Sequence, residues 1–365
     1  MSAFKLTREQ ERVIRHRGSH LQVVACAGSG KTEAISRLIA ELIAEGEEPG
    51  QIIAFTFTER AAASLKARIM KRVAERKGPA FLDRLGPMFV GTIHAYCLRL
   101  LQDHTPEFGN HDILDEHRLA GLLSREHKRL GLNKLGHQHW RPIFDFVRNV
   151  DVVENELIEV EALSEPFRGV CRRYYEALDR YHFVTYGQLI AKAVKALRDP
   201  RIHKRVHGQL RHVFVDEYQD VNPAQEKLIR LLARPPVELV VVGDDDQSIY
   251  QWRGSDVRNI ITFMKRYKGA RSLPLSQNRR SRPGIINAAN AFARTIRPRL
   301  AKAMRGYRPG EGPEVHCWAA ETDGEEARII ADTIRTLVKR GFRYRDIAVL
   351  YRSCLLYTSP SPRDS

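Results

Sequence analysis

A short run near the N-terminus combines small residues, a lysine and a hydroxyl in an order suited to phosphate binding. The run is Ala25-Cys26-Ala27-Gly28-Ser29-Gly30-Lys31-Thr32, between an expected strand and an expected helix. Glycines let backbone N–H groups wrap closely around phosphates, and a helix N-terminus favours negative charge. Lys31 is expected to neutralise the β- and γ-phosphates, and Thr32 to bind Mg²⁺ through its hydroxyl. The run therefore predicts a P-loop for ATP, with Ala25 where the general pattern has glycine.

A second stretch supplies the carboxylates that ATP chemistry needs. The apolar run 213–215 is expected to be a buried strand, and Asp216 and Glu217 follow it directly. Asp216 is expected to hold the Mg²⁺ shell, and Glu217 to accept the proton of the attacking water. An Asp-Glu pair alone often belongs to a solvated turn. After a Val-rich strand and downstream of a P-loop, it predicts ATP hydrolysis.

Cys26 is an unusual residue to find inside a phosphate loop. The nearby helix N-terminus and Lys31 would both favour its thiolate, and so raise its reactivity. The alternative is that cysteine is merely small enough to be tolerated at this position. Both interpretations are open at this point.

The elements around these residues indicate a mostly parallel sheet covered by helices, because short apolar runs alternate with amphipathic helical stretches. The runs expected to be strands are 21–25, 52–57, 213–215 and 239–242. The stretch 31–45 places apolar residues on one helical face, and Gly46 then supplies a helix stop.

Charge and cysteine usage narrow the class of protein. The formal net charge is +16 over 365 residues, which favours a polyanionic partner, nucleic acid first, although a merely basic soluble protein is the alternative. The five cysteines are scattered and never spaced as CxxC, which favours reduced thiols in a cytoplasm over disulfides or a zinc site. The sequence shows neither an apolar run of membrane-spanning length nor a secretion signal, so no membrane partner is expected.

Further motifs resemble those of superfamily 1 DNA helicases of the UvrD/Rep/PcrA type, from about Leu6 to Arg352. The run 6–10 resembles their Q-motif, which implies that Gln10 reads the adenine edge. Two later motifs resemble segments that grip single-stranded DNA in that family. The positions that they imply as DNA contacts are Phe57, Thr58, Thr92 and His94.

The most specific match is the run 242–254, VGDDDQSIYQWRG. The resemblance implies that Gln247 senses the γ-phosphate, that Tyr250 and Trp252 stack on bases, and that Arg253 links the two sites. The physics is consistent, since stacking of a base on an aromatic side chain is worth about 1–3 kcal/mol and tolerates any sequence.

The run 276–281, SQNRRS, resembles the motif that opens the second motor domain of the family. It implies that Arg280 reaches the γ-phosphate, a role that suits the fixed planar charge of arginine. Two departures from the family bear on the adenine. Arg279 replaces an aromatic that stacks on adenine, and Glu33 replaces an arginine on the other side of the base. We expect either a Glu33–Arg279 ion pair beside the adenine or two unrelated surface charges.

The predicted fold class is α/β: a P-loop RecA-like parallel sheet with a helical insertion, followed by the start of a second RecA-like domain. Residues 1–102 and 206–277 would form the first motor domain, and 103–205 the insertion, which is mainly helical by pattern. Residues 278–352 would begin the second domain. The Ser/Pro-rich tail 353–365 is expected to be non-native, with an ordinary disordered terminus as the alternative.

Within that second domain the pattern predicts a strand at 314–319, a helix at 325–339 and a strand at 347–351. The family's remaining motifs, including a second cleft arginine, would follow after residue 352, so the sequence is expected to be an incomplete fragment.

The resemblance implies an ATP-dependent helicase that moves 3′ to 5′ on single-stranded DNA, with ATP and Mg²⁺ as cofactors. Its partners would be single-stranded DNA and junctions of single with double strands. Two alternatives are open: a catalytically impaired, nucleotide-gated DNA-binding module, and the motor part of a helicase–nuclease subunit.

Overall fold

The computed structural model describes residues 5–135, 140–310 and 315–350. The chain divides into two compact units, one within residues 1–312 and one within 313–365. All the residues expected to bind nucleotide or DNA lie in the first unit.

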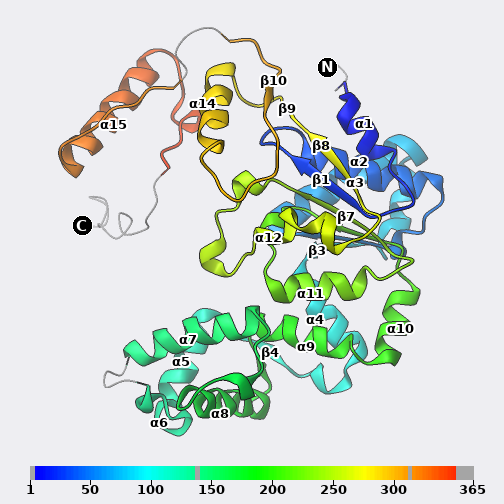
Figure 1. Cartoon of the computed structure of the whole chain (residues 1–365), viewed down its shortest axis with the longest axis vertical. Helices are drawn as coiled ribbons and strands as arrows, with labels where there is room; N and C mark the ends of the chain where they lie inside the picture. The colour runs from blue at the N-terminus through cyan, green and yellow to red at the C-terminus, as the bar shows by residue number, and fades with distance from the viewer. Residues whose placement is uncertain (1–4, 136–139, 311–314, 351–365) are drawn as a thin grey trace. The chain divides into compact units, whose positions relative to one another are not determined.

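The first unit is built on a six-stranded parallel sheet in the order β3-β2-β6-β7-β1-β8 (Figure 1). Its strands are β1 Leu21–Ala25, β2 Ile52–Thr56, β3 Phe89–Thr92, β6 His212–Val215, β7 Glu238–Gly243 and β8 Arg271–Leu275. The four predicted strands are all present, with ends that differ by one residue at most. Burial along the whole length of the central strands explains why each one is a mostly apolar run in the sequence.

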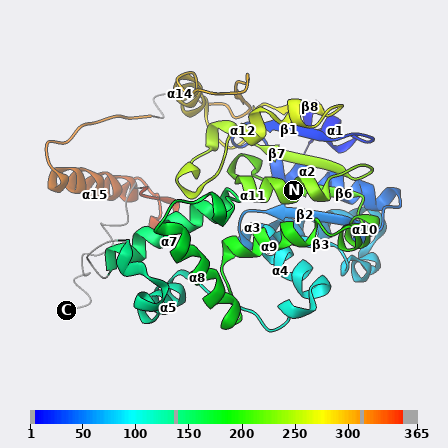
Figure 2. The same ribbon diagram turned by 60° about the horizontal axis from the view of Figure 1, so that its bottom comes forward.

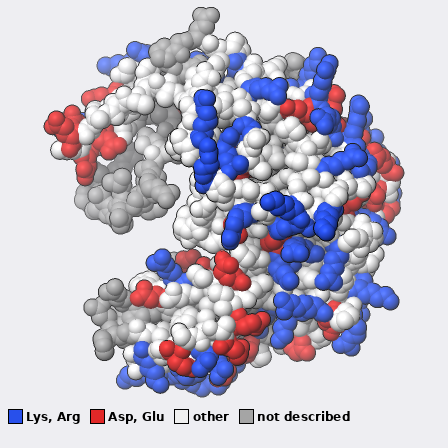
Figure 3. All heavy atoms as spheres, in the orientation of Figure 1, with Lys and Arg blue, Asp and Glu red and all other residues white. Residues whose placement is uncertain are grey.

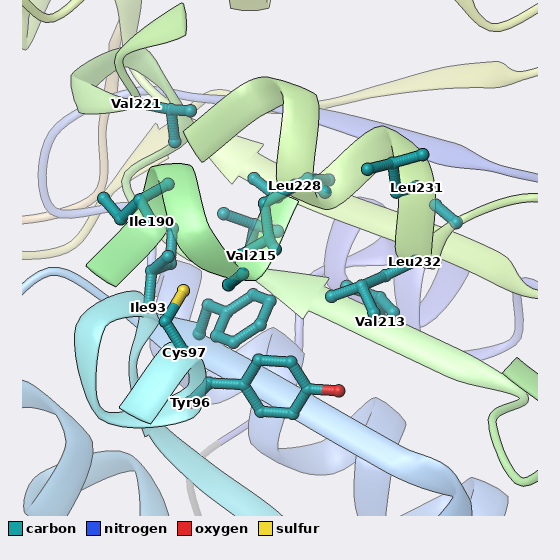
Figure 4. Close-up of a cluster of buried hydrophobic side chains, with 14 of the residues drawn as sticks. Ile93, Tyr96, Cys97, Ile190, Val213, Val215, Val221, Leu228, Leu231 and Leu232 are labelled. Atoms are coloured by element: carbon teal, nitrogen blue, oxygen red, sulfur yellow. The ribbon is translucent and has the colours of Figure 1, made fainter. Parts of the chain in front are cut away.

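Helices cover both faces of the sheet (Figures 1 and 2). The helices α2 Lys31–Glu45 and α3 Glu59–Lys77 pack on one face, and α4 Ile93–His104, α9 Tyr186–Ala196 and α11 Pro223–Leu232 on the other. Alternate strand residues serve the two cores, since Ile52 faces α2 and α3 while Ile53 faces the opposite layer. Figure 4 shows the core between the sheet and the layer of α4, α9 and α11. There Cys97 of α4, Ile190 of α9 and Leu228 of α11 pack against β6.

The predicted helix 31–45 coincides with α2, and Gly46 ends it in a left-handed conformation with φ +115°. This confirms the predicted stop, because glycine adopts positive φ without the steric cost borne by other residues.

Helices predominate between residues 103 and 205, where the pattern predicts an insertion. The described elements there are β4 Asp112–Ile113, α5 Glu116–Arg125, α6 His127–Leu130, α7 Trp140–Asn155, α8 Phe167–Arg180, β5 Phe183–Val184, α9 and α10 Pro200–Gly208. Apart from α9 and α10, these helices enclose a core of their own, which includes Leu123, Phe146 and Tyr174. The short strands β4 and β5 pair in parallel. The described residues of 112–184 thus form a small helical lobe beside the sheet, whereas α9 and α10 pack against the core of the sheet itself.

Short elements complete the first unit. They are α1 Arg8–Ile14, α12 Arg258–Ile261, α13 Phe263–Arg266, β9 Gln277–Asn278, α14 Pro283–Ala293 and β10 Arg305–Gly306. The pair β9–β10 brings the end of this stretch back beside the residues that follow β8.

The second unit contains α15 Asp323–Lys339, which matches the predicted helix 325–339. The predicted strands 314–319 and 347–351 are wrong over their described residues, 315–319 and 347–350, which form no strand. A strand needs a neighbour to bond its N–H and C=O groups, and the described part of this unit offers none. Residues 314 and 351 lie outside the described residues.

Candidate nucleotide site and the adjoining cleft

The phosphate loop joins the end of β1 to the start of α2, as predicted. Gly28 and Gly30 have φ of +66° and +83°, the left-handed region that glycine tolerates. A Cβ at Gly28 would lie 2.8 Å from the Cβ of Arg280, and one at Gly30 would lie 2.6 Å from the Nε2 of Gln10. Both positions therefore require glycine for two reasons: the backbone has a positive φ, and a neighbouring side chain leaves no room for a Cβ. The loop is held between the Q-motif residue and the residue expected to reach the γ-phosphate.

Gln10 is fully buried beside the loop. Its Nε2 donates to the carbonyl of Ser29 at 3.1 Å, and its Oε1 accepts from the backbone N–H of Thr7 at 3.0 Å. Gln10 thereby completes the capping box of α1 and fixes the phosphate loop to that helix.

Lys31 and Glu217 meet at the carboxyl edge of the sheet. The Nζ of Lys31 donates to the Oε2 of Glu217 at 2.8 Å, and the Nε2 of Gln219 donates to the same oxygen at 2.9 Å. Glu217 itself adopts φ +51°, a rare conformation for a residue with a side chain. Such backbone conformations cluster at functional sites, which is consistent with the predicted catalytic base.

Asp216 precedes Glu217, and its Oδ1 accepts the backbone N–H of Glu217 at 3.0 Å. Burial raises the pKa of Asp216 to about 6, and the charge of Glu217 adds to that rise while Lys31 opposes it. Asp216 is therefore a half-buried carboxylate whose surroundings disfavour its charged form. A hydroxyl at Thr32 and this carboxylate are the hard oxygen ligands that Mg²⁺ prefers, so these residues fit the ion.

The loop after β7 is linked by hydrogen bonds to Gln219, and through it to Glu217. The backbone N–H of Asp244 donates to the Oε1 of Gln219 at 3.0 Å, and the Nε2 of Gln247 donates to the Oδ2 of Asp244 at 2.6 Å. Gln247 is exposed. A continuous series of hydrogen bonds therefore runs from Lys31 through Glu217 and Gln219 to Asp244 and Gln247.

A cleft of about 830 Å³ lies between the carboxyl edge of the sheet and the helical lobe. Five of the residues predicted to touch DNA line it together: Phe57, Thr92, His94, Tyr250 and Trp252. The rings of Phe57 and Tyr250 stack at 5.2 Å, and Trp252 is 68% exposed. Asp216 and Glu217 line the same cleft, so the nucleotide site and the cleft share a wall.

Sequence reasoning missed two aromatic residues that line the cleft, one on α9 and one in the helical lobe. Tyr186 is 50% exposed at the start of α9 and packs edge-on against His94, with ring centroids 5.4 Å apart. Phe144 of α7 is exposed and lines the cleft from the same side. Burial lowers the pKa of His94, which makes its ring neutral near pH 7. Tyr186 directly follows the N-cap Thr185 of α9, and this local position gives no sign of the contact with His94 on α4.

One predicted DNA contact, Thr58, does not line this cleft. Its hydroxyl caps α3 by accepting the backbone N–H of Ala61 at 3.1 Å. The side chain of Arg253 lies outside the described part of the chain.

The predicted Glu33–Arg279 pair is wrong, because each side chain has other partners. Glu33 accepts from Arg37 and Arg72, each at 2.6 Å. Arg279 donates to the Lys5 carbonyl and lies over the ring of Tyr307 at 4.9 Å. Arg37 lies four residues after Glu33 on α2, a spacing that places the two on the same helix face, whereas Arg72 comes from α3 and its proximity to Glu33 could not be predicted from local sequence.

The reactive interpretation of Cys26 is also wrong. Cys26 is 2% exposed, and burial raises the pKa of its thiol to about 12, with the charge of Asp244 adding to the effect. Desolvation of a thiolate outweighs the favourable helix N-terminus here. The alternative, a small residue tolerated in the loop, agrees with the structure.

The basic charge is not concentrated at one place on the face shown in Figure 3. Lys and Arg side chains are spread over both the sheet region and the helical lobe, with Asp and Glu among them. On this face, the exposed aromatic residues of the cleft are therefore a more specific feature for a nucleic-acid partner than the distribution of charge.

Comparison with protein families matches residues 6–268 to the UvrD/REP helicase N-terminal domain and residues 273–355 to the UvrD-like helicase C-terminal domain. The ATP-dependent DNA helicase UvrD1 of Mycobacterium leprae is 34% identical over 95% of this chain and 47% of its own length. DNA helicase II of Haemophilus influenzae is 34% identical over 95% of this chain and 48% of its own. The ATP-dependent DNA helicase PcrA of Staphylococcus aureus is 31% identical, over 94% and 47%. The chain thus spans about half the length of these relatives.

Among the described residues, none of the helices combines the length and the apolar character that crossing a membrane requires.

Proposed function

Because this chain belongs to the UvrD/Rep helicase family, we propose that its two adjoining sites bind ATP and single-stranded DNA as part of an ATP-dependent, 3′-to-5′ DNA motor. The observation that carries the proposal is that the expected ATP site and the aromatic cleft have residues in common. Asp216 and Glu217, the expected ATP carboxylates, line the cleft that also holds Phe57, Tyr250 and Trp252.

At the nucleotide site, the phosphates would occupy the loop between β1 and α2. Lys31 and Arg280 would face the γ-phosphate, and Gln10 would lie beside the adenine. Thr32 and Asp216 would hold Mg²⁺, which when bound neutralises charge that develops on the phosphate oxygens. Glu217 is within reach of Lys31 and would accept a proton from the attacking water.

At the cleft, aromatic side chains would stack on successive bases without sequence preference. Phe57 and Tyr250 already form a stacked pair, and Trp252 and Tyr186 expose their rings to the same space. The neutral ring of His94 would pack against Tyr186 without adding charge. The net charge of +16 would supply the general attraction to phosphates.

Two substitutions separate the roles at the nucleotide site. Lys31→Ala should abolish binding of a fluorescent ATP analogue, whereas Glu217→Gln should keep binding and remove turnover stimulated by single-stranded DNA. Their different roles, on phosphate and on water, are the reason. Equal loss of nucleotide binding in both variants would contradict the assignment of Glu217 as the base.

The same measurements distinguish the alternative of a nucleotide-gated DNA-binding module. That alternative gains support if the wild-type chain binds both Mg·ATP and single-stranded DNA, and nucleotide changes its affinity for DNA, while no turnover is detected. A full-length relative with the matching substitutions provides the positive control for turnover.

A further inference from the structure

Three consecutive carboxylates, Asp244, Asp245 and Asp246, follow β7 and surround one ammonium group. The Nζ of Lys302 lies 3.1 Å from an oxygen of Asp244 and 3.1 Å from one of Asp246, and it also bonds Asp245. The Lys302 side chain is only 4% exposed, and that of Asp245 is fully buried. Buried charges of one sign need a close partner, because desolvation alone would disfavour them strongly.

A second cation and a backbone group reinforce this contact. Arg299 donates to both oxygens of Asp246, at 2.6 and 3.0 Å, in the two-pronged geometry that suits a carboxylate. The backbone N–H of Leu300 donates to the Oδ2 of Asp245 at 2.7 Å. Arg299 also donates to the carbonyl of Lys302 at 2.7 Å, which closes the segment on itself. We call residues 299–302 the clamp.

The clamp acts on the loop that carries residues of both sites. One oxygen of Asp244 faces Lys302, and the other accepts the amide of Gln247 at 2.6 Å. The backbone N–H of Asp244 is bonded to Gln219, which in turn bonds Glu217. Tyr250 follows on the same loop and lines the cleft.

We propose that Lys302, supported by Arg299, is a positioning residue that fixes the loop 244–250, and with it Gln247, in the arrangement needed for ATP turnover. This inference rests on the proposed function. Lys302 sets the orientation of the Asp244 carboxylate, and that carboxylate sets the orientation of the Gln247 amide. Without the ammonium, three neighbouring carboxylates repel one another, so the loop must move or one of them must take up a proton.

The test compares Lys302→Met with Lys302→Arg, which keeps the charge, and with Lys268→Met, which removes an exposed lysine elsewhere. Hydrogen exchange of peptides covering 244–250 is measured first, without nucleotide. Lys302→Met should speed exchange there, while β1 and α2 stay unchanged and both other variants behave like the wild type. Turnover is then measured against ATP concentration. For Lys302→Met, kcat should fall about tenfold or more with KM changed little, the signature of a lost transition-state interaction.

Unchanged exchange at 244–250 in Lys302→Met would overturn the inference, because the clamp would then not fix the loop. Faster exchange with wild-type kcat would also overturn it, because the clamp would be structural only. If the wild-type chain neither binds nor hydrolyses ATP, the proposed function fails, and the exchange measurement alone decides whether the clamp holds the loop. Should Lys302→Met not fold, Arg299→Gln keeps the ammonium and carries the same two readouts.

Discussion

Glu154 of α7 should make the stability of this protein fall as the pH rises. Its carboxyl is buried between α7, α8 and α9, where Thr185 donates to its Oε2 at 2.9 Å. Burial raises the pKa of Glu154 to about 8, and the charge of Asp151 adds to the rise, while hydrogen bonds from Thr185 and Tyr175 oppose it. The other ionisable groups around it are Cys171 and Tyr174 of α8. Glu154 is therefore neutral in the folded protein at pH 7.

The sign follows from proton binding. The folded state holds the proton up to about pH 8, whereas the unfolded chain releases it near its ordinary pKa of 4.5. Stability from this group is thus fully present below pH 4.5 and is lost as the pH rises to about 8. At about 1.4 kcal/mol for each pH unit, the full loss is about 5 kcal/mol, an order-of-magnitude figure.

The assay is urea unfolding, followed by circular dichroism, of the wild type and Glu154→Gln at about pH 5 and about pH 8.5. Glutamine keeps the shape and the acceptor for Thr185 but cannot ionise. At the lower pH the two proteins should differ by about 1 kcal/mol or less, and at the higher pH the variant should be more stable by about 3–5 kcal/mol. Glu156→Gln, an exposed position two residues further on, is the matched control and should track the wild type. Parallel pH profiles for wild type and Glu154→Gln would refute the reasoning.

Three further outcomes can be measured directly. Trp252→Ala should weaken binding of single-stranded DNA by about 1–3 kcal/mol with an unchanged salt dependence; a smaller salt slope at equal low-salt affinity would show that Trp252 does not stack. Mg²⁺-dependent nucleotide binding should fall as the pH drops below about 6, because protonated Asp216 cannot hold the ion, and Asp216→Asn should be weak at every pH; an equal fall in Asp216→Asn would assign the effect elsewhere. A maleimide should label exposed Cys317 quickly and buried Cys26 slowly, with or without Mg·ATP; protection of a fast-reacting Cys26 by nucleotide would restore the reactive interpretation.

The central sheet and the phosphate loop could be predicted because local sequence dictates them. Val-rich runs that are buried on both faces leave few polar positions, so β1 and β7 could be recognised from the sequence. Parallel strands also place their carboxyl ends at one edge, which brings Lys31 and Glu217 together although 186 positions separate them. Topology therefore supplies the contact once the strands are recognised.

Contacts set by helix packing could not be predicted in this way. Glu33 finds Arg72 only because α2 and α3 lie side by side on one face of the sheet. Tyr186 reaches His94 only because α9 packs along α4. Helix-on-helix packing depends on shapes summed over many side chains, which a periodic pattern does not encode. Contacts of this kind explain why the predicted Glu33–Arg279 pair was wrong and why Tyr186 was not predicted.

The two sites are joined by one series of polar contacts, and this constrains how nucleotide would act on DNA. A γ-phosphate in the loop would share Lys31 with Glu217, because one ammonium has three donors, and the second anion would weaken the Lys31–Glu217 contact of 2.8 Å. Glu217 would then depend on Gln219, whose amide oxygen also fixes Asp244. Gln219 is thus bonded to a loop that the clamp holds from the other side. That loop ends at Tyr250, stacked on Phe57 in the cleft, so one series of contacts connects the proposed nucleotide site to the proposed DNA-binding residues.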